Sequence, residues 1–366
     1  MDDKSVITSG GIEKIGLPDS FITVKLNGEK HKMERPIAEH TAGVQWIFEV
    51  LTTGDYAVLK NLEELDAVGH RMVHGGEKFN KSVRLTPEVM EAFAACNDLA
   101  PLHNPANIKG VNAVSALLPN IPQVGVFDTA FHQTMPDYAY MYALPYHLYK
   151  EYGVRRYGFH GTSHRYVSQR VCEFLGVKPE GKKIITCHIG NGASIAAVKD
   201  GKCVDTSMGL TPLEGLIMGT RSGDIDAGAV TFLMDKLNLD TKGISNLLNK
   251  QSGLAGVSEG SSDFRDILAG IANGNDKARW LRKCTPIASR STLASMLLLW
   301  VVWISSSLQV EQARTSGKCV KVLPRVSSSW VLRWTTRRTV PVVLQRLSSV
   351  PMTVRLSSAA FQRMRS

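Results

Sequence analysis

The 366-residue sequence predicts a mixed α/β fold, and three features lead to that prediction. Apolar segments typical of strands alternate along the chain with segments of helical periodicity. Residues 183–226 predict two successive β-hairpins followed by a Gly-rich loop. Polar side chains gather at the ends of the expected strands, which is where open α/β sheets place their ligands.

The elements expected ahead of the hairpins follow from local patterns. Residues 21–26 alternate as a strand, and residues 67–73 and 123–127 form apolar strands, the second ending at Asp128. Thr41 opens a helix whose apolar positions are Val44, Ile47, Phe48 and Leu51. Thr162 or Ser163 is expected to cap a second helix, which carries on one face the apolar residues Val167, Val171, Phe174 and Leu175.

The turn between the apolar runs 184–186 and 195–198 carries the first functional signal. Gly190 and Gly192 flank Asn191, and two glycines allow backbone N–H groups to approach an anion closely, so a phosphate loop is expected. The alternative is that these glycines serve only a backbone that needs positive φ. Residues 218–226 strengthen the first interpretation, because they place Arg221 and two carboxylates in a Gly-rich segment ahead of an apolar helix.

The length and the cysteine content restrict the number of domains and the cellular compartment that we expect. A chain of this length predicts about two domains. The six cysteines form no C-x-x-C pair, and no charged-then-apolar leader precedes them, so we expect a reduced, cytoplasmic protein. The apolar run 293–304 is too short to span a bilayer.

The net charge of +10 is confined to one end of the chain. Residues 279–366 hold fifteen Lys and Arg against one acidic residue, Glu311, and five of the six Trp. We find no lasting helical or strand period there. A basic nucleic-acid-binding tail is one interpretation. We favour translation in the wrong reading frame, because a shifted frame over residues 281–314 permits a helix, an apolar strand and a Gly-rich loop.

Four further segments place polar groups at strand ends, namely residues 70–77, 101–105, 127–132 and 157–164. They suit phosphoryl transfer, which needs cations and donors already in position, better than metal binding or acyl transfer. Arg71 and Arg221 can each offer a fork to a carboxylate or phosphoryl oxygen. His160 can donate to the transition state. Asp128 is expected to orient the attacking group rather than act as a base, because a carboxylate acceptor is already ionised.

In order and spacing, six motifs resemble those of the acetate kinase family, within the acetate and sugar kinase, Hsp70 and actin superfamily. They are HRMVHGGEKF, PLHNPAN, FDTAFH, RRYGFHGTSH, HIGNGAS and MGTRSGDID, within residues 1–278. The resemblance implies a two-domain actin-like ATPase (ribonuclease H-like) fold. It also implies a Mg²⁺-dependent, homodimeric, cytoplasmic enzyme that makes acetyl phosphate and ADP from acetate and ATP, reversibly, without nucleic-acid or membrane partners.

Site residues carried over from the resemblance fall into three groups. The catalytic group comprises Asp128, His160 and Arg221. Acetate is expected to meet Arg71 and a small apolar pocket, formed by Val73, Leu102, Phe159 and Pro212. The ATP phosphates are expected at the hairpin residues His188, Ile189, Gly190, Asn191 and Gly192. The nucleoside is expected beside Asp263, Phe264 and Arg265.

The resemblance also predicts departures from the family. The chain is expected to begin after the family's first strand and its Asn-x-Gly-Ser-Ser-Ser hairpin. The family's adenosine loop and metal-associated Glu would lie beyond residue 279, so the metal ligands stay unassigned. The expected domains are residues 1–132, 133–278 and an out-of-frame tail, 279–366. A propionate or butyrate kinase and a non-catalytic nucleotide-binding protein remain as alternatives.

Overall fold

The computed structural model describes residues 6–101, 103–281, 292, 295–296, 330–332, 341–346 and 351–355. Chain contacts divide it into two compact units, Met1–Leu297 and Leu298–Ser366. Every described candidate site residue lies in the first unit. Within the described residues, no helix is long and apolar enough to cross a membrane. The apolar run 293–304 lies mostly outside the described residues.

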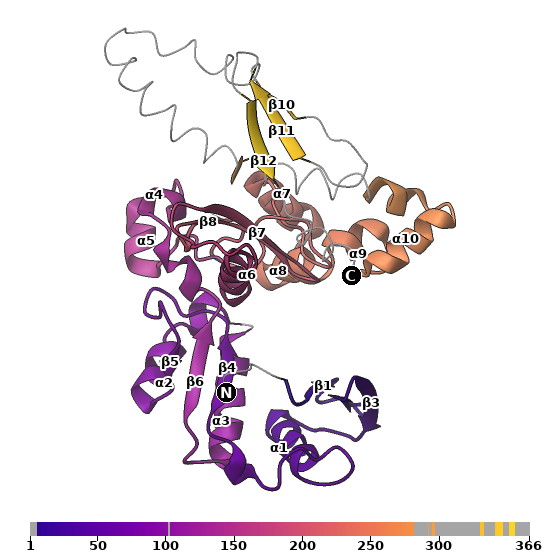
Figure 1. The fold of residues 1–366 in the computed structure, drawn as a ribbon. Helices are drawn as coiled ribbons and strands as arrows, with labels where there is room; N and C mark the ends of the chain where they lie inside the picture. Colours follow the sequence, from indigo (N-terminus) through magenta and orange to yellow (C-terminus); the bar gives the residue numbers. More distant parts are fainter. Residues whose placement is uncertain are drawn as a thin grey trace. The chain divides into compact units, whose positions relative to one another are not determined.

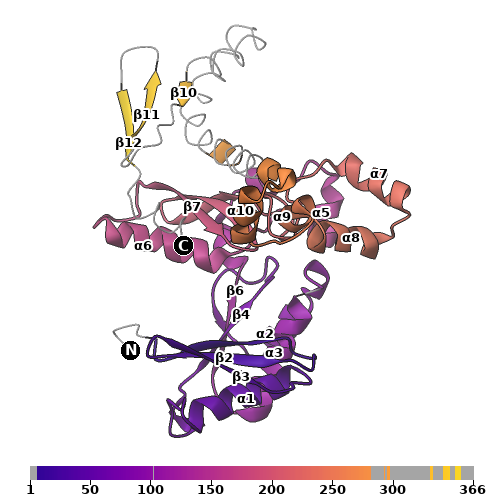
Figure 2. The same cartoon turned by 90° about the vertical axis from the view of Figure 1, so that its right-hand side faces the viewer.

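The first unit begins with an antiparallel meander, β1 (Ser9–Glu13), β2 (Phe21–Leu26) and β3 (Glu29–Glu34), in that spatial order. Asn27 and Gly28 both have positive φ, as a two-residue hairpin turn requires. Helix α1 (His40–Thr52) starts one residue before the predicted Thr41, where the Glu39 carboxylate accepts the first free backbone N–H groups. Figure 2 shows α1 beside this sheet, and a core of Ile22, Val24, Ile37, Trp46 and Val50 joins the helix to the sheet.

A second sheet carries the first two polar site residues. Strands β4 (Val68–Met72) and β6 (Gln123–Phe127) are parallel, and the short β5 (Val83–Arg84) pairs antiparallel with β6 (Figure 1). Helices α2 (Pro87–Ala94) and α3 (Asn104–Leu117) add Phe93 and Val111 to its core. Parallel pairing brings the carboxyl ends of β4 and β6 to one edge. Arg71 and Asp128 therefore meet, and the two predicted strands are confirmed.

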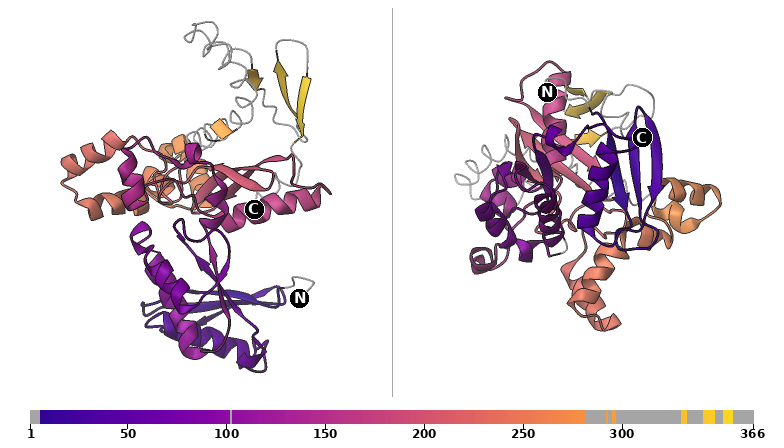
Figure 3. Two further views of the ribbon diagram at one scale, coloured as in Figure 1. Left: turned by 90° about the vertical axis from the view of Figure 1, so that its left-hand side faces the viewer. Right: turned by 90° about the horizontal axis from the view of Figure 1, so that it is seen from below.

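The predicted hairpin pair is confirmed as a third sheet. Strands β7 (Lys183–Ile189), β8 (Ala193–Lys199) and β9 (Lys202–Thr206) are antiparallel neighbours in that order. Asp200 and Gly201 have positive φ in the second turn, which matches the twist of the flanking strands. Helix α6 (Gly161–Phe174) lies along this sheet and contacts β7 (Figure 3).

The expectations for helix α6 are partly wrong. The N-cap is His160 rather than Thr162 or Ser163. The predicted apolar face is turned outward, since the exposed fractions of Val167, Phe174 and Leu175 are 38%, 64% and 52%. The buried residues instead include His164, Ser168 and Cys172. His164 can be buried because hydroxyls of the facing sheet satisfy both its ring nitrogens.

Short helices connect these layers and complete the first unit. They are η1 (Leu62–Glu64), η2 (Asn97–Leu99), η3 (Ala130–Thr134), α4 (Asp137–Tyr140), α5 (Tyr146–Tyr152), α7 (Ala227–Leu237), α8 (Thr241–Lys250), α9 (Gly253–Ser258) and α10 (Phe264–Ala272). In the tail, where no lasting strand period was expected, the structure describes three short antiparallel strands. These are β10 (Trp330–Leu332), β11 (Pro341–Arg346) and β12 (Pro351–Arg355).

Candidate active site

A paired arginine and aspartate form the base of the candidate site. The Arg71 guanidinium donates from Nε to Asp128 Oδ1 at 3.0 Å and from Nη2 to Oδ2 at 2.6 Å. The Asp128 side chain is 3% exposed, whereas that of Arg71 is 66% exposed. The buried carboxylate therefore holds one edge of the guanidinium, and the remaining Nη1 group is available to a ligand.

The start of α6 is fixed directly against Asp128. The Gly161 backbone N–H donates to the Asp128 carbonyl at 2.9 Å, and a Cβ at Gly161 would overlap that oxygen. Glycine is therefore required for this close approach. His160, the preceding residue, adopts a left-handed conformation with φ 58° and ψ 22°, which is uncommon for a residue other than glycine. His160 and Asp128 both line the cavity described below.

Histidines from α6 and β7 lie together over the pair. The His160 and His188 rings stack with centroids 4.0 Å apart. His160 Nδ1 is 2.8 Å from Ser194 Oγ, and His188 Nδ1 is 2.9 Å from Ser163 Oγ. Burial, together with the nearby His188 and Arg71, lowers the pKa of His160 to about 3. Its imidazole is therefore neutral at pH 7 and can offer one N–H donor.

Of the two glycines in the hairpin turn, Gly192 is the one whose missing side chain leaves space beside site residues. Neither Gly190 nor Gly192 has a positive φ, so the alternative explanation for them is wrong. A Cβ on Gly192 would lie 3.3 Å from His160 Nε2 and 3.5 Å from Arg221 Nη1. Gly190 would meet only the Gly192 carbonyl, at 3.5 Å. Gly192 therefore keeps open the space between an imidazole and a guanidinium.

The turn between β7 and β8 is bonded to the loop that carries Arg221. The Gly219 N–H donates to the Asn191 carbonyl at 2.9 Å, and a Cβ at Gly219 would overlap the Asn191 side chain. Arg221 Nη1 donates to the Pro212 carbonyl at 3.1 Å. Burial lowers the pKa of Arg221, whose charge makes the surroundings attractive to an anion.

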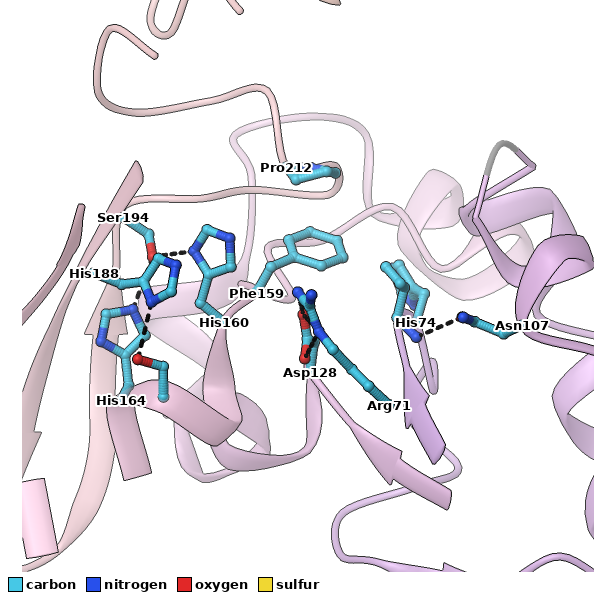
Figure 4. A network of polar contacts seen from close by, with 12 residues as sticks. Arg71, His74, Asn107, Asp128, Phe159, His160, His164, His188, Ser194 and Pro212 are labelled. Atoms are coloured by element: carbon cyan, nitrogen blue, oxygen red, sulfur yellow. Dashed lines mark hydrogen bonds and ion pairs between the residues drawn. The ribbon is translucent and has the colours of Figure 1, made fainter. Parts of the chain in front are cut away.

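A cavity of about 540 Å³ opens where these elements meet. Its lining comprises Arg71, Asp128, His160, Thr162, Ser163, Tyr166, His188 and Gly192. Figure 4 draws the Arg71–Asp128 pair, His160 and His188 around this region. The structure thus brings together five residues singled out in the sequence, namely Arg71, Asp128, His160, His188 and Gly192. Thr162, Ser163 and Tyr166 were not predicted to line a site, although the first two lie in the motif that contains His160.

The predicted apolar pocket is described in part. Phe159 is buried and Val73 and Pro212 are partly buried, while Leu102 lies outside the described residues. The His74 ring packs edge-on against Phe159, with centroids 5.4 Å apart, and the Val73 N–H donates to Asn107 at 2.9 Å. Figure 4 draws Phe159 between His160 and His74, with Pro212 nearby.

The remaining predicted ATP residues are placed differently. Ile189 ends β7 with 64% of its surface exposed. Asp263 caps α10 and forms a two-bond pair with Arg265 in an exposed position, and neither lines the cavity. Phe264 begins α10, but its side chain lies outside the described residues.

The two carboxylates near Arg221 have structural partners. Asp226 caps α7 by accepting from the Gly228 N–H, and Asp224 accepts from the Gly215 N–H at 2.7 Å. Among the residues that the structure describes, no group of three or more His, Cys, Asp or Glu could hold a metal ion. Asp128 is the carboxylate that lines the cavity.

Several residues beside the site were not predicted as functional. His103 has its pKa lowered by burial and by the charges of Arg221 and Arg71. Ser194 and His164 contact His160 directly or through one another. His103 and Ser194 belong to the motifs quoted above. The sequence of such a motif does not show whether a histidine or serine in it contacts a neighbouring side chain or the substrate.

Comparison with known proteins shows the family to which the chain belongs. The model of the acetokinase family matches residues 1–297. Acetate kinases of Bacteroides fragilis and Bacteroides thetaiotaomicron are each 72% identical over 279 residues, which is 76% of this chain and 70% of theirs.

Solved structures match at the level of the whole first unit. The crystal structure of Porphyromonas gingivalis acetate kinase has 55% identity and a TM-score of 0.76, and the match covers 81% of this chain and 74% of that one. A propionate kinase from Francisella tularensis has 39% identity and the same TM-score, covering 81% and 75%. The predicted α/β, actin-like ATPase fold is thereby confirmed. The chain belongs to the acetokinase family.

Proposed function

We propose that this chain's site transfers the γ-phosphoryl group of ATP to acetate, reversibly, giving acetyl phosphate and ADP. One observation carries the proposal. Arg71, Asp128, His160 and Gly192 line one cavity, and Arg221 Nη1 lies 3.5 Å from the position that a Cβ on Gly192 would take. Two cations and a neutral donor around space cleared by a glycine suit a group whose charge spreads over its oxygens.

In the proposed reaction an acetate oxygen attacks the γ-phosphorus while the bond to the β,γ-bridging oxygen breaks. The electron pair of that bond leaves with ADP, and no proton needs to be removed because the acceptor is ionised. Arg221 and the open Nη1 of Arg71 attract the equatorial oxygens of the transferred group. His160 adds a neutral N–H donor without a further positive charge.

Asp128 acts in this scheme by orientation. Its two bonds hold the Arg71 guanidinium in one plane, and its own charge is compensated by that contact. The acetate methyl would lie against Val73, Phe159 and Pro212, with Leu102 as a further proposed contact. Residues 188–192 would receive the ATP phosphates, whereas Asp263, Phe264 and Arg265 are proposed beside the nucleoside.

Magnesium fits this site as an ion that arrives with the nucleotide. Mg²⁺ is commonly held by one or two carboxylates, substrate phosphates and water, so a preformed cluster of protein ligands is not required. Asp128 is the cavity carboxylate that could contribute. When bound, the ion would neutralise charge on the β- and γ-phosphates.

Acetate-dependent formation of acetyl phosphate from ATP, trapped as the hydroxamate, tests the proposal. We expect activity in the full chain, and a fall of about a hundredfold or more in Arg221→Ala, since that variant removes a preformed cation from the transition state. ATP binding without any acetate-dependent product would overturn the proposal and would favour a non-catalytic nucleotide-binding protein.

Propionate is the second candidate acceptor, because a propionate kinase is among the similar structures. One methylene in an apolar pocket changes binding by only about 1–3 kcal/mol. The ratio of kcat/KM for acetate, propionate and butyrate decides between them, and a higher value for either longer acid would refute acetate as the preferred substrate.

We also propose a homodimeric, cytoplasmic protein without nucleic-acid partners, as the family resemblance implies. Sedimentation of the purified chain tests the dimer. A gel-shift assay with DNA at low and moderate salt tests the proposed absence of nucleic-acid binding. Binding through the basic residues of 279–366 would weaken steeply as the salt concentration rises.

A further inference from the structure

A continuous line of buried polar side chains runs from the third sheet to His160. Thr186 Oγ1 is 2.7 Å from His164 Nδ1, His164 Nε2 is 2.8 Å from Ser194 Oγ, and Ser194 Oγ is 2.8 Å from His160 Nδ1. Thr186, His164 and Ser194 are each no more than 2% exposed. Figure 4 shows His160, Ser194 and His164 together. The line ends at the cavity, which His160 helps to enclose.

The backbone explains why these groups meet. Thr186 and His188 are two residues apart on β7 and share a face, and Ser194 lies directly opposite His188 in the strand pairing. His160 and His164 are four residues apart, one turn along the start of α6. Packing α6 on this face of the sheet therefore interleaves the two histidines with the two hydroxyls.

Counting protons shows that the line can be ordered in two directions. In the first, Thr186 donates to His164 Nδ1, His164 Nε2–H donates to Ser194, and Ser194 donates to His160 Nδ1. The His160 proton then lies on Nε2. In the second, every donor and acceptor is reversed, the His160 proton lies on Nδ1, and Nε2 presents a lone pair. Both directions require neutral rings, and burial lowers the pKa of His164 well below its ordinary value, as it does for His160.

The far end of the line distinguishes the two directions. Among the described residues, the Thr186 hydroxyl has no hydrogen-bond partner other than His164. In the second direction Thr186 would accept from His164, so its own proton would be buried without an acceptor, which is unfavourable. In the first direction each hydroxyl proton in the line has an acceptor. The first direction is therefore preferred.

We propose that Thr186, His164 and Ser194 are positioning residues that hold His160 as the Nε2–H tautomer, with its proton directed toward the transferred phosphoryl group. The assignment of the phosphoryl group rests on the proposed function, whereas the tautomer does not. Nε2 is the nitrogen nearest the space cleared by Gly192, so a proton there can reach an oxygen placed between His160 and Arg221. A lone pair in the same place would repel that oxygen.

Long-range ¹H–¹⁵N NMR of the histidine-labelled full chain tests the proposal, because it separates protonated from unprotonated ring nitrogens. His160→Gln assigns the His160 signals by their loss. In the unsubstituted chain we expect the His160 proton on Nε2. In Thr186→Val, which removes one hydroxyl that does not touch His160, we expect both tautomers, and Thr186→Ser should restore Nε2–H.

Two further variants complete the design. Ser194→Ala removes the final donor and is expected to mix the tautomers as well. Ser163→Ala is the matched control, since it breaks the His188 contact at 2.9 Å but leaves the line intact. The His160 tautomer should then stay on Nε2. If Ser194→Ala does not fold, the Thr186→Val and Thr186→Ser pair decides the question.

Kinetics supply a second readout. We expect Thr186→Val to lower kcat about tenfold with the KM for acetate changed by less than about twofold, because the donor acts on the transition state. A proton on Nδ1 in the unsubstituted chain, or Nε2–H unchanged in both Thr186→Val and Ser194→Ala, overturns the proposal. An Nε2–H tautomer in a chain that forms no acetyl phosphate would overturn the proposed function and leave the positioning role standing.

Discussion

Adding one methyl group at Gly192 should block phosphoryl transfer without unfolding the protein. Gly192 has no positive φ, so alanine fits its backbone without strain. The new Cβ would lie 3.3 Å from His160 Nε2, 3.4 Å from its Cε1 and 3.5 Å from Arg221 Nη1. It would therefore occupy the space between the two groups proposed to hold the transferred oxygens.

The size of the effect follows from these distances. An oxygen that accepts from His160 Nε2 must lie about 2.7–3.1 Å away. A methyl carbon already 3.3 Å from that nitrogen leaves no room for the oxygen on the same side, so the phosphoryl group must shift by roughly 1 Å. A displacement of this size can cost about a hundredfold in rate, equivalent to about 2.7 kcal/mol.

Acetyl phosphate formation at saturating ATP and acetate measures the loss. Gly11→Ala is the control, because Gly11 lies in β1 outside the proposed site, also lacks positive φ, and its Cβ would meet nothing within 4 Å. We expect that variant to stay within about threefold of the unsubstituted chain. Urea unfolding should give similar midpoints for both variants. Activity of Gly192→Ala equal to that of Gly11→Ala would refute the reasoning.

Three other predictions follow from the same structure. Asp128→Asn should raise the KM for acetate and lower kcat/KM by about a hundredfold, since Arg71 loses its charged partner, and an unchanged KM would contradict this. Burial lowers the pKa of His132 from its ordinary value of about 6.5 to about 4, so the unfolded chain binds the proton first as the pH falls. Protonation of His132 in the unfolded chain should therefore lower the free energy of unfolding by about 2 kcal/mol as the pH falls from 7 to 5. Equal urea midpoints at pH 7 and pH 5 would exclude this contribution. Sequencing the coding DNA across residues 277–280 should reveal a gained or lost base, whereas an uninterrupted frame would reject the proposed out-of-frame tail.

The strands and hairpins could be predicted because their signals are local. Residues 21–26 and 123–127 carry strand patterns that coincide with β2 and β6, and the two glycine-containing turns fall where β7, β8 and β9 are joined. In these segments the period of the apolar residues and the chemistry of the turns agree with the tertiary structure.

Helix α6 shows where local patterns fail. Its apolar residues were predicted to share a face, and on that face Phe174 and Leu175 are exposed while His164 and Ser168, on another face, are buried. Only contacts from β7 and β8, at least 20 residues away, make that polar face suitable for burial. The cap is similarly non-local, because His160 takes its left-handed conformation where Gly161 is bonded to the Asp128 carbonyl.

The same distinction separates the predicted site residues from those that were missed. Arg71 and Asp128 are charged groups at the ends of β4 and β6, which is a recognisable signal for ligand binding. His160 was also expected at a strand end, but it precedes α6 without a strand before it, and Arg221 lies in the Gly-rich loop ahead of α7. Their distances from one another, however, depend on backbone contacts between separate segments. Gly161 bonds to Asp128, and Gly219 bonds to Asn191, with glycine required by close approach in both places.

These two backbone contacts explain how the site can be both precise and tolerant of substitution. Each joins main-chain atoms, so removing the side chain of His160 or Arg221, to which we assign roles in the reaction, leaves these backbone contacts intact. The side chains inside the cavity are therefore separable from the framework that positions them. Substitutions at Gly161 or Gly219 should act in the opposite way, since a Cβ there would push apart the segments that carry His160 and Asp128, and the β7–β8 turn and the loop of Arg221.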